Sequence, residues 1–309
     1  MPAVETEPGI ASAPVIAVSW LGASAALPFA LVGAVSGQGI GALIGRCHWI
    51  GVTLPLDRQV WALVNQPVLN FASLPSAAGY WLGSILLPLV VAVTIISFLP
   101  QARSWVTQLG CIQISWAMSL VAVAMLPLLD SEDGHLARFL ALHGAPPSLV
   151  WLSPACAAGA ALLPTSRLLQ LARRRHPDIR RSYRLLVVAI HLGVPTAGWV
   201  GLVSLARGSV PIPAIFAAAA TPIAALAFAW SRYPSPYVRP LEGPKAGEIT
   251  GLAIAAVLLA AIVWVAGRPL TGGQSAGILW GTAQSSNNIR PWIKPWSVTG
   301  DTATALGPE

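Results

Sequence analysis

Seven stretches of this chain are apolar over roughly the 20 residues that a helix needs to cross a bilayer, and none of them contains Asp, Glu, Lys or Arg. Hydrocarbon offers no partner for backbone N–H and C=O groups, so a segment that crosses it must satisfy these groups internally, as a helix does. The sequence therefore predicts an all-α, polytopic transmembrane bundle of about seven spans. The approximate spans are residues 14–35, 77–98, 108–129, 146–164, 185–206, 213–230 and 250–267.

The scarcity of charge supports this interpretation. Only 9% of the 309 residues are charged and 55% are hydrophobic, whereas about 25% of the residues in soluble domains are charged. So few ionic side chains cannot cover a water-facing surface. We expect a short polar N-terminal tail over 1–13, a transmembrane helical domain over 14–267 and a polar C-terminal tail over 268–309.

The segment 36–76 is harder to assign. It contains two moderately apolar pieces, GQGIGALIGRCHWIGVTLPL and WALVNQPVLNFASLP. Each predicts an interfacial helix or a re-entrant hairpin, and a full span here would change the side on which the N-terminus lies. Nearby small residues predict close helix contacts at Gly41-x-x-x-Gly45 and Gly79-x-x-x-Gly83, because small side chains let two backbones approach.

Basic residues are distributed unequally between the two sides that the spans define. Loops rich in Lys and Arg stay in the cytoplasm, so we expect a protein of the cell (inner) membrane with its N-terminus cytoplasmic and its C-terminus outside. This topology explains the net charge of +7 without a nucleic-acid partner. The richer side holds Arg103, Arg167, Arg173, Arg174, Arg175, Arg180, Arg181, Arg184, Arg232, Arg239 and Lys245.

Aromatic and basic side chains near the bilayer surface are candidates for contact with anionic lipid head groups or protein partners. Tryptophan prefers the headgroup level, and Trp20, Trp81, Trp105, Trp151, Trp230 and Trp264 lie near the ends of predicted spans. The candidates for lipid or partner contact are Arg173, Arg174, Arg175, Arg180 and Arg181 in the basic loop, with Trp292 and Trp296 in the tail.

His191 is the one histidine inside a predicted span, which makes it a functional candidate. Pro195 follows four residues later and has no N–H to donate to the carbonyl of residue 191. A free acceptor therefore lies beside the imidazole. We consider a hydrogen bond between helices, a proton relay, and an axial ligand to a haem or pigment. The sequence identifies no particular cofactor.

A second candidate site begins at Ser131-Glu132-Asp133-Gly134-His135. It resembles a degraded His-Glu-x-x-His motif of site-2-type intramembrane metalloproteases, in which two histidines bind zinc and the glutamate is the base. Ser131 occupies the place of the first histidine. Glu242, in Pro240-Leu241-Glu242-Gly243, resembles the acidic ligand of that family's second motif. The resemblance implies Glu132, His135 and Glu242 as metal-site candidates in an inactive relative.

The sequence contains neither a phosphate-binding loop nor a Gly-x-Ser-x-Gly elbow. No predicted span contains the central charged residue that a charge-coupled transporter needs. We therefore expect a non-enzymatic integral membrane protein, an accessory or scaffold subunit of a larger complex such as a respiratory or photosynthetic one. The alternatives are the inactive protease-like protein and a small-molecule permease or channel.

Overall fold

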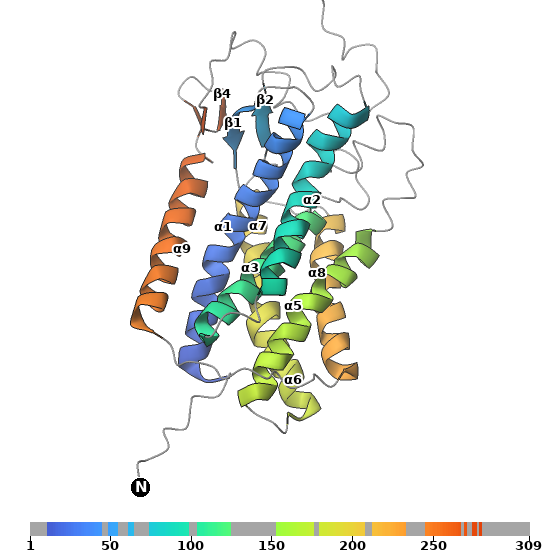
Figure 1. The fold of residues 1–309 in the computed structure, drawn as a ribbon, viewed down its shortest axis with the longest axis vertical. Coiled ribbons are helices and arrows are strands. Elements are labelled where there is room, and N and C mark those ends of the chain that lie inside the picture. The colour runs from blue at the N-terminus through green and yellow to red at the C-terminus, as the bar shows by residue number, and fades with distance from the viewer. Residues whose placement is uncertain are drawn as a thin grey trace, which may run out of the picture.

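A computed structural model describes residues 11–44, 49–54, 61–64, 74–98, 104–124, 153–175, 179–207, 212–232, 245–266, 269–270, 274–276 and 278–279. Most of these residues are helical, as expected of an all-α protein (Figure 1). The helices are α1 (Ala13–Ile44), α2 (Leu74–Phe98), α3 (Trp105–Ala124), α5 (Ser153–Arg175), α6 (Arg181–Val188), the π-helical turn η4 (Ala189–Gly193), α7 (Val194–Arg207), α8 (Ile212–Ser231) and α9 (Ala246–Ala266).

Seven helical segments result, because α6, η4 and α7 follow one another without a break. Each overlaps one of the seven predicted spans. Within the described part of the chain, four helices are long and apolar enough to cross a membrane, namely Ala13–Ile44, Trp105–Val123, Arg181–Leu202 and Ala246–Trp264. The apolar stretches found in α2 and α8, Leu82–Phe98 and Ala219–Ser231, are shorter. The apolar helices indicate a membrane-embedded protein.

α1 lies at the centre of one half of the bundle, where it packs against α2, α3 and α9 (Figure 1). Gly37 and Gly41 of α1 face Gly79 and Gly83 of α2, and a methyl group added at Gly79 would lie 2.6 Å from the carbonyl oxygen of Gly41. The predicted close contact at Gly79 and Gly83 is therefore confirmed. Its partner on α1 is the pair 37 and 41, and Gly45 lies outside the described residues.

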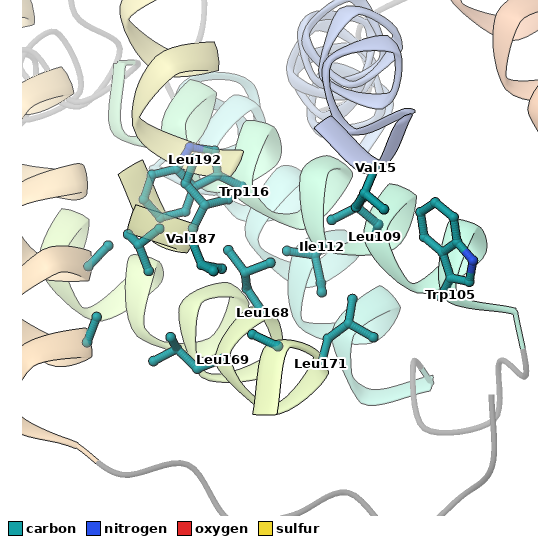
Figure 2. Packing of buried hydrophobic residues seen from close by; sticks show 14 of the residues in the cluster. Val15, Trp105, Leu109, Ile112, Trp116, Leu168, Leu169, Leu171, Val187 and Leu192 are labelled. Carbon is teal, nitrogen blue, oxygen red and sulfur yellow. The ribbon is translucent and has the colours of Figure 1, made fainter. Parts of the chain in front are cut away.

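The largest buried cluster lies where α3, α5 and α6 meet, next to the start of α1. Figure 2 shows Trp116 and Ile112 of α3 pointing toward Leu168 of α5 and Val187 of α6. α8 closes this half by packing against α5 and α6. Apolar side chains thus meet between helices that are far apart in the sequence.

A carboxylate joins the N-termini of α3 and α9. Ser104 caps α3, since its hydroxyl oxygen accepts a hydrogen bond from the amide of Val106 at 3.2 Å. The same hydroxyl donates to Glu248 at 2.6 Å. Glu248 also accepts from the amide of Lys245 at 3.3 Å, as in a capping box, and from the hydroxyl of Thr107 at 3.3 Å. One side chain therefore satisfies donors at two helix ends.

Part of the segment 36–76 differs from the prediction. α1 continues to Ile44 as one helix of 32 residues, and two strands follow, β1 (Trp49–Thr53) and β2 (Trp61–Val64). They pair antiparallel, and β5 (Ile278–Leu279) adds to the other edge of β1. The described part of this segment therefore contains the end of α1, a β-hairpin and the start of α2, and no separate interfacial helix. Two further short strands, β3 (Pro269–Leu270) and β4 (Gln274–Ala276), pair with each other.

The expectation for one tryptophan is wrong. Trp105 is only 4% exposed and belongs to the buried cluster, so it does not face lipid. Trp20, Trp230 and Trp264 are exposed, as interfacial residues would be. The side chain of Trp81 and all of Trp151 lie outside the described residues.

Candidate functional site

His191 lies at the centre of the π-helical turn η4, and its side chain is completely buried. A π-helical turn widens a helix by one residue, and such turns are frequent at functional sites. Pro195 follows η4 and supplies no amide hydrogen. In an α-helix its amide would have bonded the carbonyl of His191, and in a π-helix that of Ile190. Neither the carbonyl of His191 nor that of Ile190 can therefore accept a hydrogen bond from residue 195.

Side chains from two other helices supply donors to these two carbonyls. The Nε2 of Gln113 in α3 donates to the carbonyl of His191. The indole Nε1 of Trp20 in α1 donates to the carbonyl of Ile190 at 3.3 Å. The carbonyl of His191, which Pro195 deprives of its α-helical donor, therefore accepts a side-chain hydrogen bond, and so does the neighbouring carbonyl of Ile190. The backbone carbonyl of His191 makes this hydrogen bond between helices.

Gln113 connects three helices. Besides the carbonyl of His191, its Nε2 donates to the hydroxyl oxygen of Ser19 in α1 at 2.9 Å. Both N–H groups of the side-chain amide are therefore used, and Oε1 is the other terminal atom of this side chain. Gln113 is completely buried, and Oε1 has no hydrogen-bond donor among the described residues.

A second polar contact lies one turn further along α3. The indole Nε1 of Trp116 donates to the hydroxyl of Thr196 in α7 at 2.9 Å. Thr196 in turn donates to the carbonyl of Leu192 in η4 at 2.7 Å. All three side chains are buried. The polar groups around η4 thus fasten α3 and α1 to the irregular part of the α6–η4–α7 helix.

This polar cluster contains one titratable side chain, His191. The contacts described involve its backbone, so an axial-ligand or relay role for its imidazole remains a prediction. The sequence identified His191 and the acceptor created by Pro195, but it gave no sign that Gln113 and Trp20 are the donors. They are 78 and 170 residues away from their acceptors, and the only available signal was a polar residue in an apolar run.

Arginines gather at the end of the bundle where α5 ends and α6 begins (Figure 1). Arg180 and Arg181 are exposed, whereas Arg173 and Arg174 are half-buried. The guanidinium of Arg181 lies 5.4 Å from the ring centroid of Trp230 in α8, a cation–π distance. The side chain of Arg175 lies outside the described residues.

Arg184 is buried beneath these exposed arginines, and only 4% of its surface is exposed. Its Nη1 donates to the carbonyl oxygen of Arg232, directly after the last residue of α8. A cation at a helix C-terminus interacts favourably with the helix dipole and satisfies a terminal carbonyl. This basic residue therefore has a structural role within the bundle.

The β-hairpin is fastened to the opposite end of the bundle. The amide of Ala62 in β2 donates to Oε1 of Gln38 in α1 at 2.7 Å, and the carbonyl of Ala62 accepts from the hydroxyl of Tyr80 in α2 at 3.1 Å. Trp49 of β1 packs directly on Gly39, where an added methyl group would overlap the indole. The hairpin therefore covers the ends of α1 and α2.

Several candidates from the sequence lie outside the described residues. These are Glu132, His135 and Glu242, the metal-site candidates of the protease-like interpretation, and Trp292 and Trp296 of the tail. That interpretation remains a prediction. Within the described ranges no group of three or more His, Cys, Asp or Glu side chains is arranged to hold a metal ion. No family model, curated protein or solved structure matches this chain.

Proposed function

We propose that this chain is a non-enzymatic, multi-pass subunit of the cell (inner) membrane that acts as a scaffold for a larger membrane assembly. The observation that carries this proposal is an open glycine surface on α7. Gly198 and Gly201 are exposed, and no atom of the described residues lies within 4 Å of a methyl group added at either position. In lipid, such surfaces let the backbone of another helix approach closely.

A close contact between glycines already joins two helices inside the bundle, which supports the proposal. Gly37 and Gly41 of α1 form a close contact with Gly79 and Gly83 of α2. The glycines of α7 have no such partner among the described residues. A helix from another subunit would complete a contact of the same type. Ala197, which is also exposed, extends the small-residue surface by one position.

The use of the buried polar groups also favours a scaffold over a transport path. Ser19, Gln113, Trp116 and Thr196 direct their hydrogen bonds to other helices and to the η4 carbonyls. These bonds hold the helices in fixed positions. A permease would instead use such groups to line a polar route.

We further propose that all seven helical segments span the membrane and that the N-terminus is cytoplasmic. What supports the orientation is the position of the arginines at the α5–α6 end, which is also the end at which α1 begins (Figure 1). Positive loops remain in the cytoplasm. Reporter fusions at the two termini test this proposal, because opposite locations are expected for an odd number of spans.

The scaffold role is tested with a photo-crosslinking residue at position 201 and with the variant Gly201→Leu. We expect a crosslinked product of discrete mass in native membranes, and loss of the same companion from Gly201→Leu on gentle purification. The matched control is Gly159→Leu on α5, where the glycine is also exposed with open space around it. A chain that gives only lipid adducts and purifies as a single monomer would overturn the proposal.

A further inference from the structure

A corner between α6 and α8 combines positive charge with an exposed indole. It is the part of the predicted lipid-contact region that the structure describes best. We define this α6–α8 corner by Arg180, Arg181, Trp230 and Arg232. All four are exposed. We propose that the corner binds the phosphate-bearing head group of an anionic phospholipid. This inference rests on the membrane embedding and orientation proposed above, and it is independent of the scaffold role.

The corner is held in place by buried groups beneath it. Ile179, only 4% exposed, anchors the chain just before α6. The buried Arg184 donates its backbone amide to the carbonyl of Arg180 at 3.1 Å, and its Nη1 to the carbonyl of Arg232. One side chain therefore ties the start of α6 to the end of α8. The exposed guanidinium groups project from a fixed base.

Arg180 is the N-cap of α6, and it has an extended backbone, with φ −68° and ψ 156°. Among the described residues, no side chain caps the first amides of this helix. Amides at a helix N-terminus together with guanidinium groups are suited to phosphate oxygens, because both donate hydrogen bonds and carry positive charge. The side chains of Arg180 and Arg232 make no hydrogen bond or ion pair with any residue that the structure describes.

Little negative charge is available to neutralise this corner within the described part of the chain. Glu248 is the one acidic residue there. Its carboxylate is engaged by Ser104, Thr107 and the amide of Lys245 at the start of α9. Glu248 is therefore engaged elsewhere in the bundle.

The surroundings of the corner favour a lipid over a soluble anion. Trp230 lies beside Arg181 and is 54% exposed, as befits an indole at the headgroup level. Ile223, seven residues earlier on the same face of α8, is 64% exposed. An acyl chain can lie along this apolar face while its phosphate reaches the guanidinium groups.

The test measures lipid retention by the purified full-length chain in mild detergent, using native mass spectrometry. The probes are phosphatidylglycerol and phosphatidylcholine with identical acyl chains. We expect preferential retention of phosphatidylglycerol. The double variant Arg180→Gln, Arg181→Gln should weaken it about 25-fold, since each basic group near a lipid surface contributes about fivefold in affinity. Trp230→Leu should also weaken it, and Trp230→Phe should restore most of the binding.

The matched control is Lys245→Gln, which removes one exposed charge from the same end of the bundle but outside the corner. Its retention of phosphatidylglycerol should stay within about twofold of that of the unmodified chain, because most of the affinity is local. Equal losses in Lys245→Gln and Arg181→Gln would show diffuse attraction and overturn the proposal. Competition by soluble glycerol phosphate at equal strength would assign the corner to a free phosphate and would also overturn it.

Circular dichroism and size-exclusion chromatography show whether each variant is folded before its lipid binding is compared. The lipid measurement uses the isolated chain, whereas the scaffold test depends on a companion at α7. A chain that retains phosphatidylglycerol but has no companion would refute the scaffold role alone, and the reverse result would refute the lipid site alone.

Discussion

Replacing Gln113 by Leu should destabilise the bundle mainly through a carbonyl that lies in another helix. Leu has a similar volume, so packing changes little. The substitution removes the hydrogen bonds from Nε2 to Ser19 and to the carbonyl of His191. The α-helical donor to that carbonyl is absent, because the residue four positions later is Pro195. A buried acceptor thus loses the donor that Gln113 supplies.

The magnitude follows from these contacts. An unsatisfied buried acceptor costs about 1–3 kcal/mol, and a side-chain hydrogen bond between membrane helices contributes about 0.6 kcal/mol on average. Oε1 of Gln113 has no donor among the described residues, so the removal of this buried polar atom offsets part of the loss in stability. We expect Gln113→Leu to lower the free energy of unfolding by about 1–3 kcal/mol. Ser19→Ala, which leaves the bond to His191 in place, should lower it by only about 0.6 kcal/mol.

The decisive measurement is a double-mutant cycle with Pro195→Ala. This substitution restores an amide hydrogen, which can bond the carbonyl of His191 if the turn relaxes toward an α-helix. Gln113→Leu should then cost less in the Pro195→Ala background, with a coupling of at least about 1 kcal/mol. Unfolding would be followed by far-ultraviolet circular dichroism in mixed micelles. Strictly additive effects, or no effect of Gln113→Leu, would refute the reasoning.

Three further substitutions test other contacts by the same unfolding measurement. Gly79→Ala should cost about 1–3 kcal/mol, because the added methyl group meets the α1 backbone, whereas Gly110→Ala, with open space around it, should be neutral or slightly stabilising. Glu248→Ala should destabilise the start of α9 by about 0.5–2 kcal/mol, unlike Thr250→Ala, whose hydroxyl bonds only within its own helix. Tyr80→Phe should cost about 0.5–1.5 kcal/mol through the hydrogen bond lost to the hairpin, and an unchanged stability would show that this bond is not needed to hold β2.

The helices could be predicted from the sequence because burial in lipid imposes one requirement on every segment. A run without charged residues has to satisfy its backbone internally, so each apolar run coincides with a helix. The ends were less accurate. α5 begins at Ser153 and continues to Arg175, beyond the apolar run, because α6 and α8 pack against its basic end as well. Packing extends helices past the limits that hydropathy sets.

The strands could not be predicted in the same way. Trp49–Thr53 and Trp61–Val64 are short apolar pieces with aromatic and β-branched residues, and short runs of this kind fit a strand or a helix equally well. Their assignment depends on partners elsewhere in the chain. β1 pairs with β5 of the C-terminal region, and β2 depends on Gln38 and Tyr80. No local pattern reveals such long-range pairing.

The candidate site shows the same division between local and long-range information. Pro195 is local, so the free carbonyl of His191 follows from the sequence alone. The identity of its donor does not, because Gln113 reaches it only through the packing of α3 against η4. The sequence predicted Arg181 as part of a basic loop and Trp230 as an interfacial indole, but it did not relate the two. The cation–π contact depends on how α6 lies against α8.

The polar groups of the interior and the exposed groups of the outer surface differ in how many contacts they make. This difference supports the proposed binding surfaces. Around η4, Gln113 and Trp116 use their donors on neighbouring helices, so movement there would break hydrogen bonds in a medium that offers few replacements. On the outer surface, the glycine pair of α7 and the side chains of Arg180 and Arg232 have no partner among the described residues. Binding at these outer positions would require no rearrangement of the polar interior. The proposed scaffold role requires such an arrangement, in which a bundle with a fixed interior binds its partners on the outer surface.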